Sequence, residues 1–276
     1  MPGDPSPGKH AASAIAAAER TRKDAAFQVQ APRRPLRWYR LARASLKLAA
    51  YCYSSVEVEG RELIPPGPVL YCFSHQSWID PMYVISVLPG SPRLYFFGPQ
   101  ENDMRRGVRN RLMRWFGLVI PFAPGSRGLL AATHRSVELA TTGASIAIAG
   151  EGRIHCGESC LLPLKEGAAY IALRARIPLV PMAINGTSWL GFRRRVRVRL
   201  GNAIEPSQAT AGRPDAAEVA ALTAKASESL LDLVADFGDR RAPGPVGRWL
   251  TELFNEWPDG RRPTSPPKPV SPTQGS

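Results

Sequence analysis

The sequence predicts a single α/β domain with a mostly parallel mixed sheet flanked by helices. Along the middle of the chain, short apolar segments alternate with amphipathic ones, which is typical of strands and helices that follow one another in a parallel sheet. The chain has 276 residues, of which 44% are hydrophobic. This is enough for one sizeable domain, or at most two small ones, around a real core.

The periodicity of apolar residues places the individual elements. Strands are expected at residues 56–58, 69–73, 93–97, 118–122, 145–149, 179–184 and 196–200. Helices are expected at residues 35–53, 81–88, 105–116, 129–141, 165–174, 215–237 and 246–257. The helix at 215–237 has one apolar face, formed by Val219, Leu222, Ala226, Leu230, Leu233 and Phe237. The helix at 246–257 carries Trp249, Phe254 and Trp257, which either complete the core or contact lipid.

The two ends of the chain differ in composition from its middle. Residues 1–32 are mainly Ala, Pro, Gly and charged residues, and residues 263–276 form a Pro/Ser tail. Both ends are expected to be disordered. Between them we expect a basic amphipathic helix at 33–55, the α/β domain at 56–240 and the short aromatic helix at 241–262.

The formal net charge of +13 indicates an anionic partner. Nucleic acid, an anionic membrane surface and a phosphorylated substrate all satisfy this condition. The helix at 35–53 contributes Arg37, Arg40, Arg43 and Lys47, with no acidic residue. Its mostly apolar stripe consists of Trp38, Leu41, Ser45, Leu48 and Cys52. Such a helix suits an anionic lipid surface, or else it packs its apolar stripe on the domain and leaves its arginines in solvent; the two are compatible.

No apolar run reaches the roughly 18 residues that a spanning helix needs. The N-terminal residues lack the apolar segment of a signal peptide. We therefore expect no signal peptide and no transmembrane helix, and a peripheral position on the cytoplasmic side of the membrane. Cys156 and Cys160 do not have the spacing of a zinc site, and the four cysteines favour a reducing compartment.

The segment from Ser74 to Pro81 carries the most informative chemistry. It follows an apolar strand and precedes a helix, where open α/β sheets place their sites. His75 and Asp80 are five residues apart, so a turn is needed before Asp80 can hydrogen-bond one ring nitrogen and leave the other to face a substrate. Alternatively, Asp80 before Pro81 is an N-cap and His75 a loop histidine.

Three further segments follow. Gly150, Glu151, Gly152 and Arg153 come directly after a strand, and Lys165 begins the next helix. The glycines allow a sharp turn and the arginine suits phosphate. Pro181 interrupts an apolar strand, which predicts an edge strand, a bulge or a strand end. The last segment is a strand at 118–122 that runs into a glycine-rich loop with Arg127.

Taken together, these segments resemble the glycerolipid acyltransferase family typified by the 1-acylglycerol-3-phosphate acyltransferases. That family has an H-x-x-x-x-D block, a Gly…Arg block, an E-G-x-R-like block and a V-P strand. The matching residues are His75 and Asp80, then Glu151 and Gly152, then Lys165 in a K-x-G-A-A sequence, then Val180 and Pro181. The resemblance covers about residues 56–206. There are three departures: Arg127 lies late, Gly150 stands where proline is usual, and Arg153 follows Gly152 directly.

The resemblance implies an O-acyltransferase whose donor is acyl-CoA or acyl carrier protein and whose acceptor is a lysophospholipid. His75 would be the general base and Asp80 its partner. The expected substrate-binding residues are Arg127, Glu151, Gly152, Arg153, Lys165 and Pro181. Glu151 would fix either Arg153 or the loop backbone, and amides at 150–152 would stabilise an oxyanion. No metal or redox cofactor is implied, and the departures leave the acceptor open.

Two other functions compete with this interpretation. The first is a non-catalytic basic protein that coats membrane or nucleic acid, in which residues 193–199 would supply charge. That segment alternates like a half-buried strand, however, and no nucleic-acid motif accompanies it, so no nucleic-acid partner is expected. The second is a thioester hydrolase in which His75 activates water or Ser77. No G-x-S-x-G sequence occurs to support it.

Overall fold

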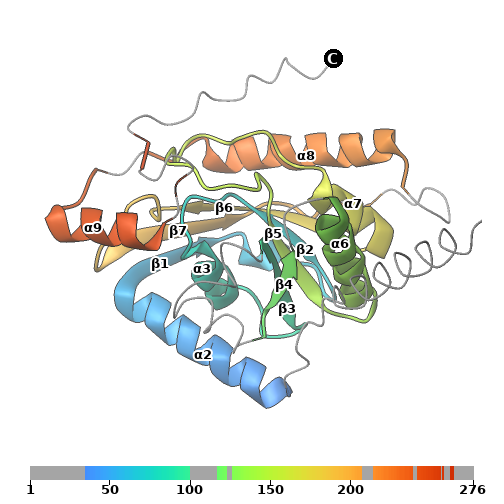
Figure 1. Cartoon of the computed structure of the whole chain (residues 1–276), viewed down its shortest axis with the longest axis horizontal. Coiled ribbons are helices and arrows are strands. Elements are labelled where there is room, and N and C mark those ends of the chain that lie inside the picture. Colours follow the sequence, from blue (N-terminus) through green and yellow to red (C-terminus); the bar gives the residue numbers. More distant parts are fainter. Residues whose placement is uncertain are drawn as a thin grey trace, which may run out of the picture.

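One mixed sheet with helices on both faces forms the centre of the molecule (Figure 1). The computed structural model describes residues 35–99, 117–122, 126–206, 214–238, 241–255, 257 and 262–263. The fold class expected from the sequence is confirmed. The expected helix at 105–116, the segment 1–32 and nearly all of the tail at 263–276 lie outside the described residues.

The sheet has seven strands in the order β1-β7-β6-β2-β5-β3-β4. Neighbouring strands are parallel except β6 and β7, so β1 and β7 run opposite to the other five. The strands are β1 (Ser54–Glu59), β2 (Leu70–Phe73), β3 (Leu94–Pro99), β4 (Val119–Phe122), β5 (Ser145–Ala149), β6 (Leu179–Asn185) and β7 (Arg194–Leu200). The carboxyl ends of β2, β5 and β6 therefore meet at one edge of the sheet.

Helices α6 (Ser126–Thr141), α7 (Gly167–Ala175) and α8 (Ala216–Val234) cover one face, and α2 (Leu36–Tyr53) and α3 (Asp80–Val87) cover the other (Figure 1). A further helix, α9 (Pro245–Phe254), lies at one end of the molecule, and a short 3₁₀ turn spans Arg61–Leu63. These bounds agree with the expected helices to within a few residues.

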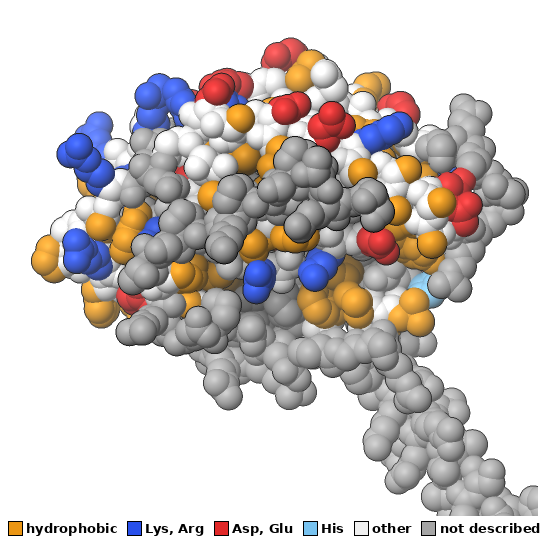
Figure 2. Space-filling model, turned by 90° about the horizontal axis from the view of Figure 1, so that it is seen from above, with side chains coloured by type: hydrophobic (Ala, Val, Ile, Leu, Met, Phe, Trp, Pro, Cys, Tyr) orange, Lys and Arg blue, Asp and Glu red, His pale blue; other side chains and the backbone are white. Residues whose placement is uncertain are grey.

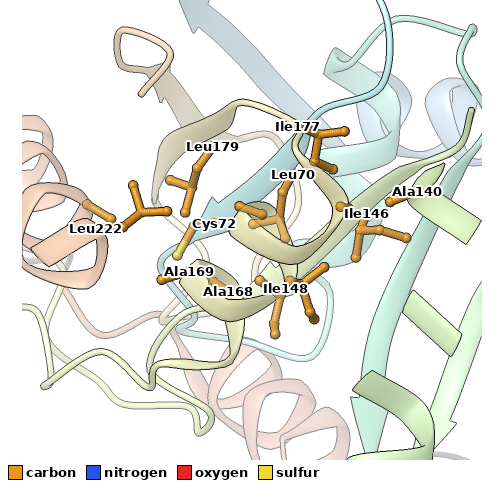
Figure 3. Packing of buried hydrophobic residues seen from close by; sticks show 14 of the residues in the cluster. Leu70, Cys72, Ala140, Ile146, Ile148, Ala168, Ala169, Ile177, Leu179 and Leu222 are labelled. Carbon is orange, nitrogen blue, oxygen red and sulfur yellow. The ribbon is translucent and has the colours of Figure 1, made fainter. Parts of the chain in front are cut away.

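Alternation along each strand divides the core into two layers. In β2, Leu70 and Cys72 point to the side of α7 and α8, whereas Tyr71 and Phe73 point to the side of α3. Because both faces are covered, all four residues are buried and the strand is apolar throughout. Figure 3 shows the first layer, in which small residues of α7 such as Ala168 let the helix approach the sheet closely.

Helix α8 buries its apolar face. Its N-terminus is closed by a capping box, in which Asp215 accepts from the amide of Glu218 and the Glu218 carboxylate accepts from that of Asp215. Five of the six residues of the expected apolar face are buried, and Leu233 is half-buried. Burial of this stripe against β6 is what stabilises the helix.

Helix α2 exposes its apolar stripe. All five residues of the expected stripe are exposed, including Leu41 at 55% and Leu48 at 66%. The helix packs against α3 and the sheet through a different stripe, formed by Tyr39, Ala42, Leu46 and Ala50. The alternative in which the stripe at 38–52 packs on the domain is therefore wrong.

Pro181 lies in a central strand and not at an edge, and of the expected alternatives the structure shows a bulge beside it. Strand β6 is hydrogen-bonded on one side to β2 and on the other to β7. The carbonyl of Pro178 accepts from Leu70 of β2 and that of Met182 from Ser74 just after β2, so the nitrogen of Pro181 faces β7. The β7 ladder ends there, because Met182 and Leu200 form its last pair. Pairing then resumes one residue out of register, because the amide of Gly201 donates to the carbonyl of Pro181 and Leu179 pairs with Ile204. The missing N–H of proline thus falls at a bulge.

The aromatic residues of α9 divide between core and surface. Trp257, just beyond the helix, is buried, whereas Trp249 is 61% exposed together with Val246 and Leu253. The side chain of Phe254 lies outside the described residues. Trp257 therefore belongs to the core and Trp249 does not, and contact of Trp249 with lipid stays a prediction.

Candidate active site

The loop between β2 and α3 folds around the carboxylate of Asp80. Oδ2 of Asp80 accepts hydrogen bonds from the amides of Gln76 (2.7 Å) and Ser77 (2.8 Å) and lies 2.9 Å from Nδ1 of His75. Asp80 is the first residue of α3, and its own amide donates to the carbonyl of Ser77 (3.0 Å). This provides the turn that the five-residue spacing requires. Oδ2 binds groups that precede the helix, so the N-cap interpretation does not describe it.

This geometry fixes the tautomer of His75. A carboxylate only accepts hydrogen bonds, so Nδ1 carries a proton toward Asp80 and Nε2 keeps its lone pair. Asp80 is fully buried, whereas the side chain of His75 is 19% exposed. The ring also packs edge-on against Phe73, with 5.7 Å between centroids. The arrangement is that of a general base with an orienting carboxylate.

Glu151 connects the loop after β5 to the histidine loop. Its Oε1 accepts from the amide of His75 (3.0 Å), and its Oε2 accepts from the amide of Leu162 (2.9 Å). Nε2 of His155 lies 2.7 Å from Oε2, at ion-pair distance but outside hydrogen-bond geometry. The carboxylate is buried and engaged with backbone, so of the two roles expected for Glu151, the structure supports fixing the loop.

Gly150 is closely packed, so that a side chain there would displace its neighbours. A Cβ at this position would lie 2.7 Å from Sγ of Cys72 and 2.9 Å from Cδ2 of Leu164. The departure from the proline that is usual in the family thus accompanies close contacts with Cys72 on β2 and with Leu164. Burial, reinforced by the charge of Glu151, raises the pKa of Cys72 to about 12, so this thiol stays protonated and is no nucleophile.

Two of the three amides expected to stabilise an oxyanion are already used within the protein. The amide of Gly150 donates to the carbonyl of Phe73 (3.0 Å), and that of Gly152 donates to the carbonyl of Ala149 (3.1 Å). Gly152 has a φ of 69°, the left-handed conformation that glycine adopts readily. Its part is to form the turn, and the amides of Gly150 and Gly152 do not face a substrate.

Arg153 and Lys165 supply positive charge beside this turn. Both side chains are exposed, and neither has a hydrogen-bond or ionic partner among the residues that the structure describes. A Cβ on Gly152 would lie 3.4 Å from Cγ of Lys165, and the amide of Lys165 donates to the carbonyl of Gly150 (2.8 Å). The two cations therefore flank the loop that holds His75.

The structure does not bring all predicted site residues together. Pro181 is buried within the sheet opposite Cys72, not in the loops at its edge, and its role in substrate binding stays a prediction. The side chain of Arg127 lies outside the described residues. His75, Asp80, Glu151 and Gly152 converge, with Arg153 and Lys165 beside them.

Sequence reasoning missed residues that hold these loops. Ser77 is fully buried, and its hydroxyl donates to Oδ1 of Asn255 (2.9 Å), which leaves it unsuited to act as a nucleophile. Glu158 is buried and accepts from the amide of Gly186 and the hydroxyl of Ser188, across the end of β6. Of these supporting residues, only His155 could have been noticed in the sequence, because it is a histidine four residues after Glu151.

Comparisons with known proteins find acyltransferases. The family model described as Acyltransferase matches residues 55–185. The chloroplastic 1-acyl-sn-glycerol-3-phosphate acyltransferase BAT2 of Brassica napus is 28% identical over 149 residues, which are 53% of this chain and 42% of that protein. The crystal structure of the 1-acyl-sn-glycerophosphate (LPA) acyltransferase PlsC from Thermotoga maritima matches with a TM-score of 0.56 and 20% identity, over 74% of this chain and 81% of that one.

The fold and the histidine–aspartate loop describe an α/β protein in which His75 and Asp80 are paired at the end of a central strand. The segment matched by the acyltransferase family model spans both β2 and β6 and includes His75, Asp80 and Glu151. The match spans less than half the length of the Brassica protein, and the likeness to PlsC concerns the fold.

Proposed function

We propose that this protein transfers a fatty acyl group from a thioester, either acyl-CoA or acyl carrier protein, to the hydroxyl of a 1-acylglycerol-3-phosphate-type acceptor. The reaction would serve phospholipid biosynthesis or remodelling. The observation that carries the proposal is the 2.9 Å contact between Nδ1 of His75 and the buried Asp80, which leaves Nε2 as a base. The match to the acyltransferase family model and the names of the two relatives support the substrate class.

The chemistry follows from the weakness of an alcohol as a nucleophile at neutral pH. Nε2 of His75 removes the hydroxyl proton as the oxygen attacks the thioester carbonyl. The C–O bond forms, the C–S bond breaks, and the imidazolium returns the proton to the departing thiolate. Asp80 keeps the ring oriented and stabilises its charge while it holds the proton. These steps use no metal or redox cofactor.

The direct test is acyl transfer by His75→Ala and Asp80→Asn proteins. His75→Ala should lower kcat by about 10² to 10⁴-fold, because general-base catalysis contributes that much. Asp80→Asn should lose less, since the base remains and only its orientation and charge support change. Thermal unfolding shows whether each protein is folded. Transfer at the wild-type rate by a folded His75→Ala protein contradicts the mechanism.

The phosphate of the acceptor would bind Arg153 and Lys165. A guanidinium can hold phosphate through two hydrogen bonds, and both cations are exposed and free among the described residues. Arg153→Ala should raise KM for a phosphorylated lysolipid more than for an unphosphorylated one. Arg153→Lys should lower KM for the phosphorylated lysolipid only part of the way back to the wild-type value. An equal loss on both acceptors would assign Arg153 a structural role.

A peripheral position on an anionic membrane is part of the proposal. Helix α2 combines its exposed apolar stripe with Arg37, Arg40 and Lys47 and contains no acidic residue. On the opposite face of the sheet, α8 carries three acidic residues and one lysine. A basic helix with an exposed apolar face suits the interface of an anionic bilayer. Among the described residues, no helix is both long and apolar enough to span it.

The rival functions find less support. The arginines of β7 that might bind nucleic acid face carboxylates of β1: Arg195 and Arg197 pair with Glu57, and Arg199 with Glu59. The hydrogen bond from Arg195 lowers the pKa of Glu57, so that carboxyl remains ionised. The face in Figure 2 carries side chains of both charges. Assays of thioester hydrolysis without acceptor and of duplex-DNA binding separate both rivals from acyl transfer.

A further inference from the structure

Asn255 links the C-terminal part of the chain to the histidine loop. It follows α9 directly, in extended conformation, and its side chain is buried. Oδ1 of Asn255 accepts two hydrogen bonds, from the hydroxyl of Ser77 (2.9 Å) and from the amide of Trp78 (2.9 Å). Because a backbone N–H can only donate, the amide group of Asn255 must present its oxygen here.

The donors of these two hydrogen bonds lie in the loop between His75 and Asp80. Asp80 accepts from the amides of Gln76 and Ser77, and Asn255 accepts from the next amide, that of Trp78. Three consecutive N–H groups of the loop are thus satisfied by two side chains. Without Asn255, a buried hydroxyl and the Trp78 amide lose this acceptor, so the loop would relax to find others.

Helix α9, which Asn255 follows directly, is attached to the segment after β6. The amide of Leu190 donates to Oγ1 of Thr251 (2.9 Å), and that hydroxyl donates to the carbonyl of Gly247 (2.7 Å). A Cβ on Gly247 would lie 2.8 Å from the carbonyl oxygen of Leu190, so α9 lies in close contact with the segment after β6. The amide of Asn255 also donates to the carbonyl of Thr251 (3.1 Å).

We propose that Asn255 is a positioning residue for the acyl transfer reaction, which acts by holding the loop of His75 and Asp80 and does not touch the substrate. The proposal rests on His75 as the base. It gives a residue just after α9 a role in positioning the catalytic loop, although the family match ends at residue 185. The C-terminal segment is therefore required for full activity, beyond any contribution to stability.

The expected effect is selective for kcat. A displacement of about 1 Å at a catalytic group can cost about 100-fold in rate. Asn255→Ala should lower kcat by about 10- to 100-fold per folded protein, while KM for the acceptor changes by about twofold or less, because Arg153 and Lys165 lie on another loop. Amide hydrogen exchange of the peptide containing residues 74–80 should become faster, since Trp78 loses its acceptor.

Thr251→Ala is the matched control. It removes a hydrogen bond that attaches α9 to Leu190 and leaves the bonds of Asn255 in place. It should lower the midpoint of thermal unfolding, but lower kcat and raise exchange at 74–80 much less than Asn255→Ala. Equal effects of the two variants on kcat would assign Asn255 to general packing and overturn the proposal. Unchanged kcat in folded Asn255→Ala would overturn it as well.

A second variant covers the case in which Asn255→Ala does not fold. Ser77→Ala removes one of the two bonds without altering α9, so it should show the same kcat-selective loss to a smaller degree. Ser77→Ala with wild-type kcat and exchange would contradict the proposal. Failure of this proposal can be told apart from failure of the proposed function. If the proposed function is wrong, the His75→Ala protein still transfers acyl groups. The hydrogen-exchange measurement reports on the loop at 74–80 alone.

Discussion

Helices α2 and α8 are the two longest described helices, and they lie on opposite faces of the sheet. Both have an apolar stripe at helical spacing in the sequence. In α8 the stripe is buried against β6, whereas in α2 it faces outward and the helix packs through Tyr39, Ala42 and Ala50. An amphipathic pattern therefore identifies a face of a helix, but not what covers that face.

The two helices also differ in charge. Helix α2 carries four basic residues and no acidic one, whereas α8 carries three acidic residues and one basic one. An apolar stripe beside cations suits an anionic lipid surface, and one beside carboxylates does not. The stripe of α8 is buried in the core, whereas that of α2 is exposed.

The largest expected effect is on folding stability. Leu230→Ala, in the buried stripe of α8, should lower the free energy of unfolding by about 2 to 5 kcal/mol, because a buried leucine is replaced by a cavity. Leu48→Ala, in the exposed stripe of α2, should change it by about 0.5 kcal/mol or less. Chemical denaturation of both proteins checks the difference. Comparable losses at the two positions would show that α2 also buries its stripe.

The next effect is on binding to anionic vesicles. Replacing Arg37, Arg40 and Lys47 by Gln should weaken binding by about 1 kcal/mol per charge at low ionic strength, and less at high salt. Arg43 is left in place because its guanidinium donates to the carbonyl of Leu88. Lys225→Gln on α8 is the control and should leave vesicle binding unchanged. Binding that is insensitive to the α2 replacements would make α2 a packing element only.

The smallest effect concerns a single exposed side chain. Leu48→Ser should weaken vesicle binding by about 1 kcal/mol, since the leucine loses its transfer into the interface, while thermal unfolding stays the same. Sedimentation with vesicles measures the first quantity and calorimetry the second. A lower unfolding temperature with unchanged vesicle binding would show that Leu48 stabilises the fold and does not contact the membrane.

Much of the candidate site was predictable because its residues lie in short segments with strong local signals. The apolar strand before His75, the five-residue spacing to Asp80 and the glycines around Glu151 each have a local physical reason. The turn that brings Asp80 to His75 was required by the spacing and is present. The sequence left two roles open for Glu151. Its hydrogen-bond partners are the amides of His75 and Leu162, and the spacing of residues around Glu151 does not reveal them.

The sequence by itself determined the alternation of strands and helices, the mixed sheet expected from it, and the histidine–aspartate pair. These depend on periodicity and on contacts between residues close in the chain. Only the tertiary structure decided the place of Pro181 in a central strand, the outward stripe of α2, and the bonds of Asn255 to Ser77 and Trp78. Each of these depends on which distant segment lies alongside, and local pattern carries no information about a partner some 180 residues away.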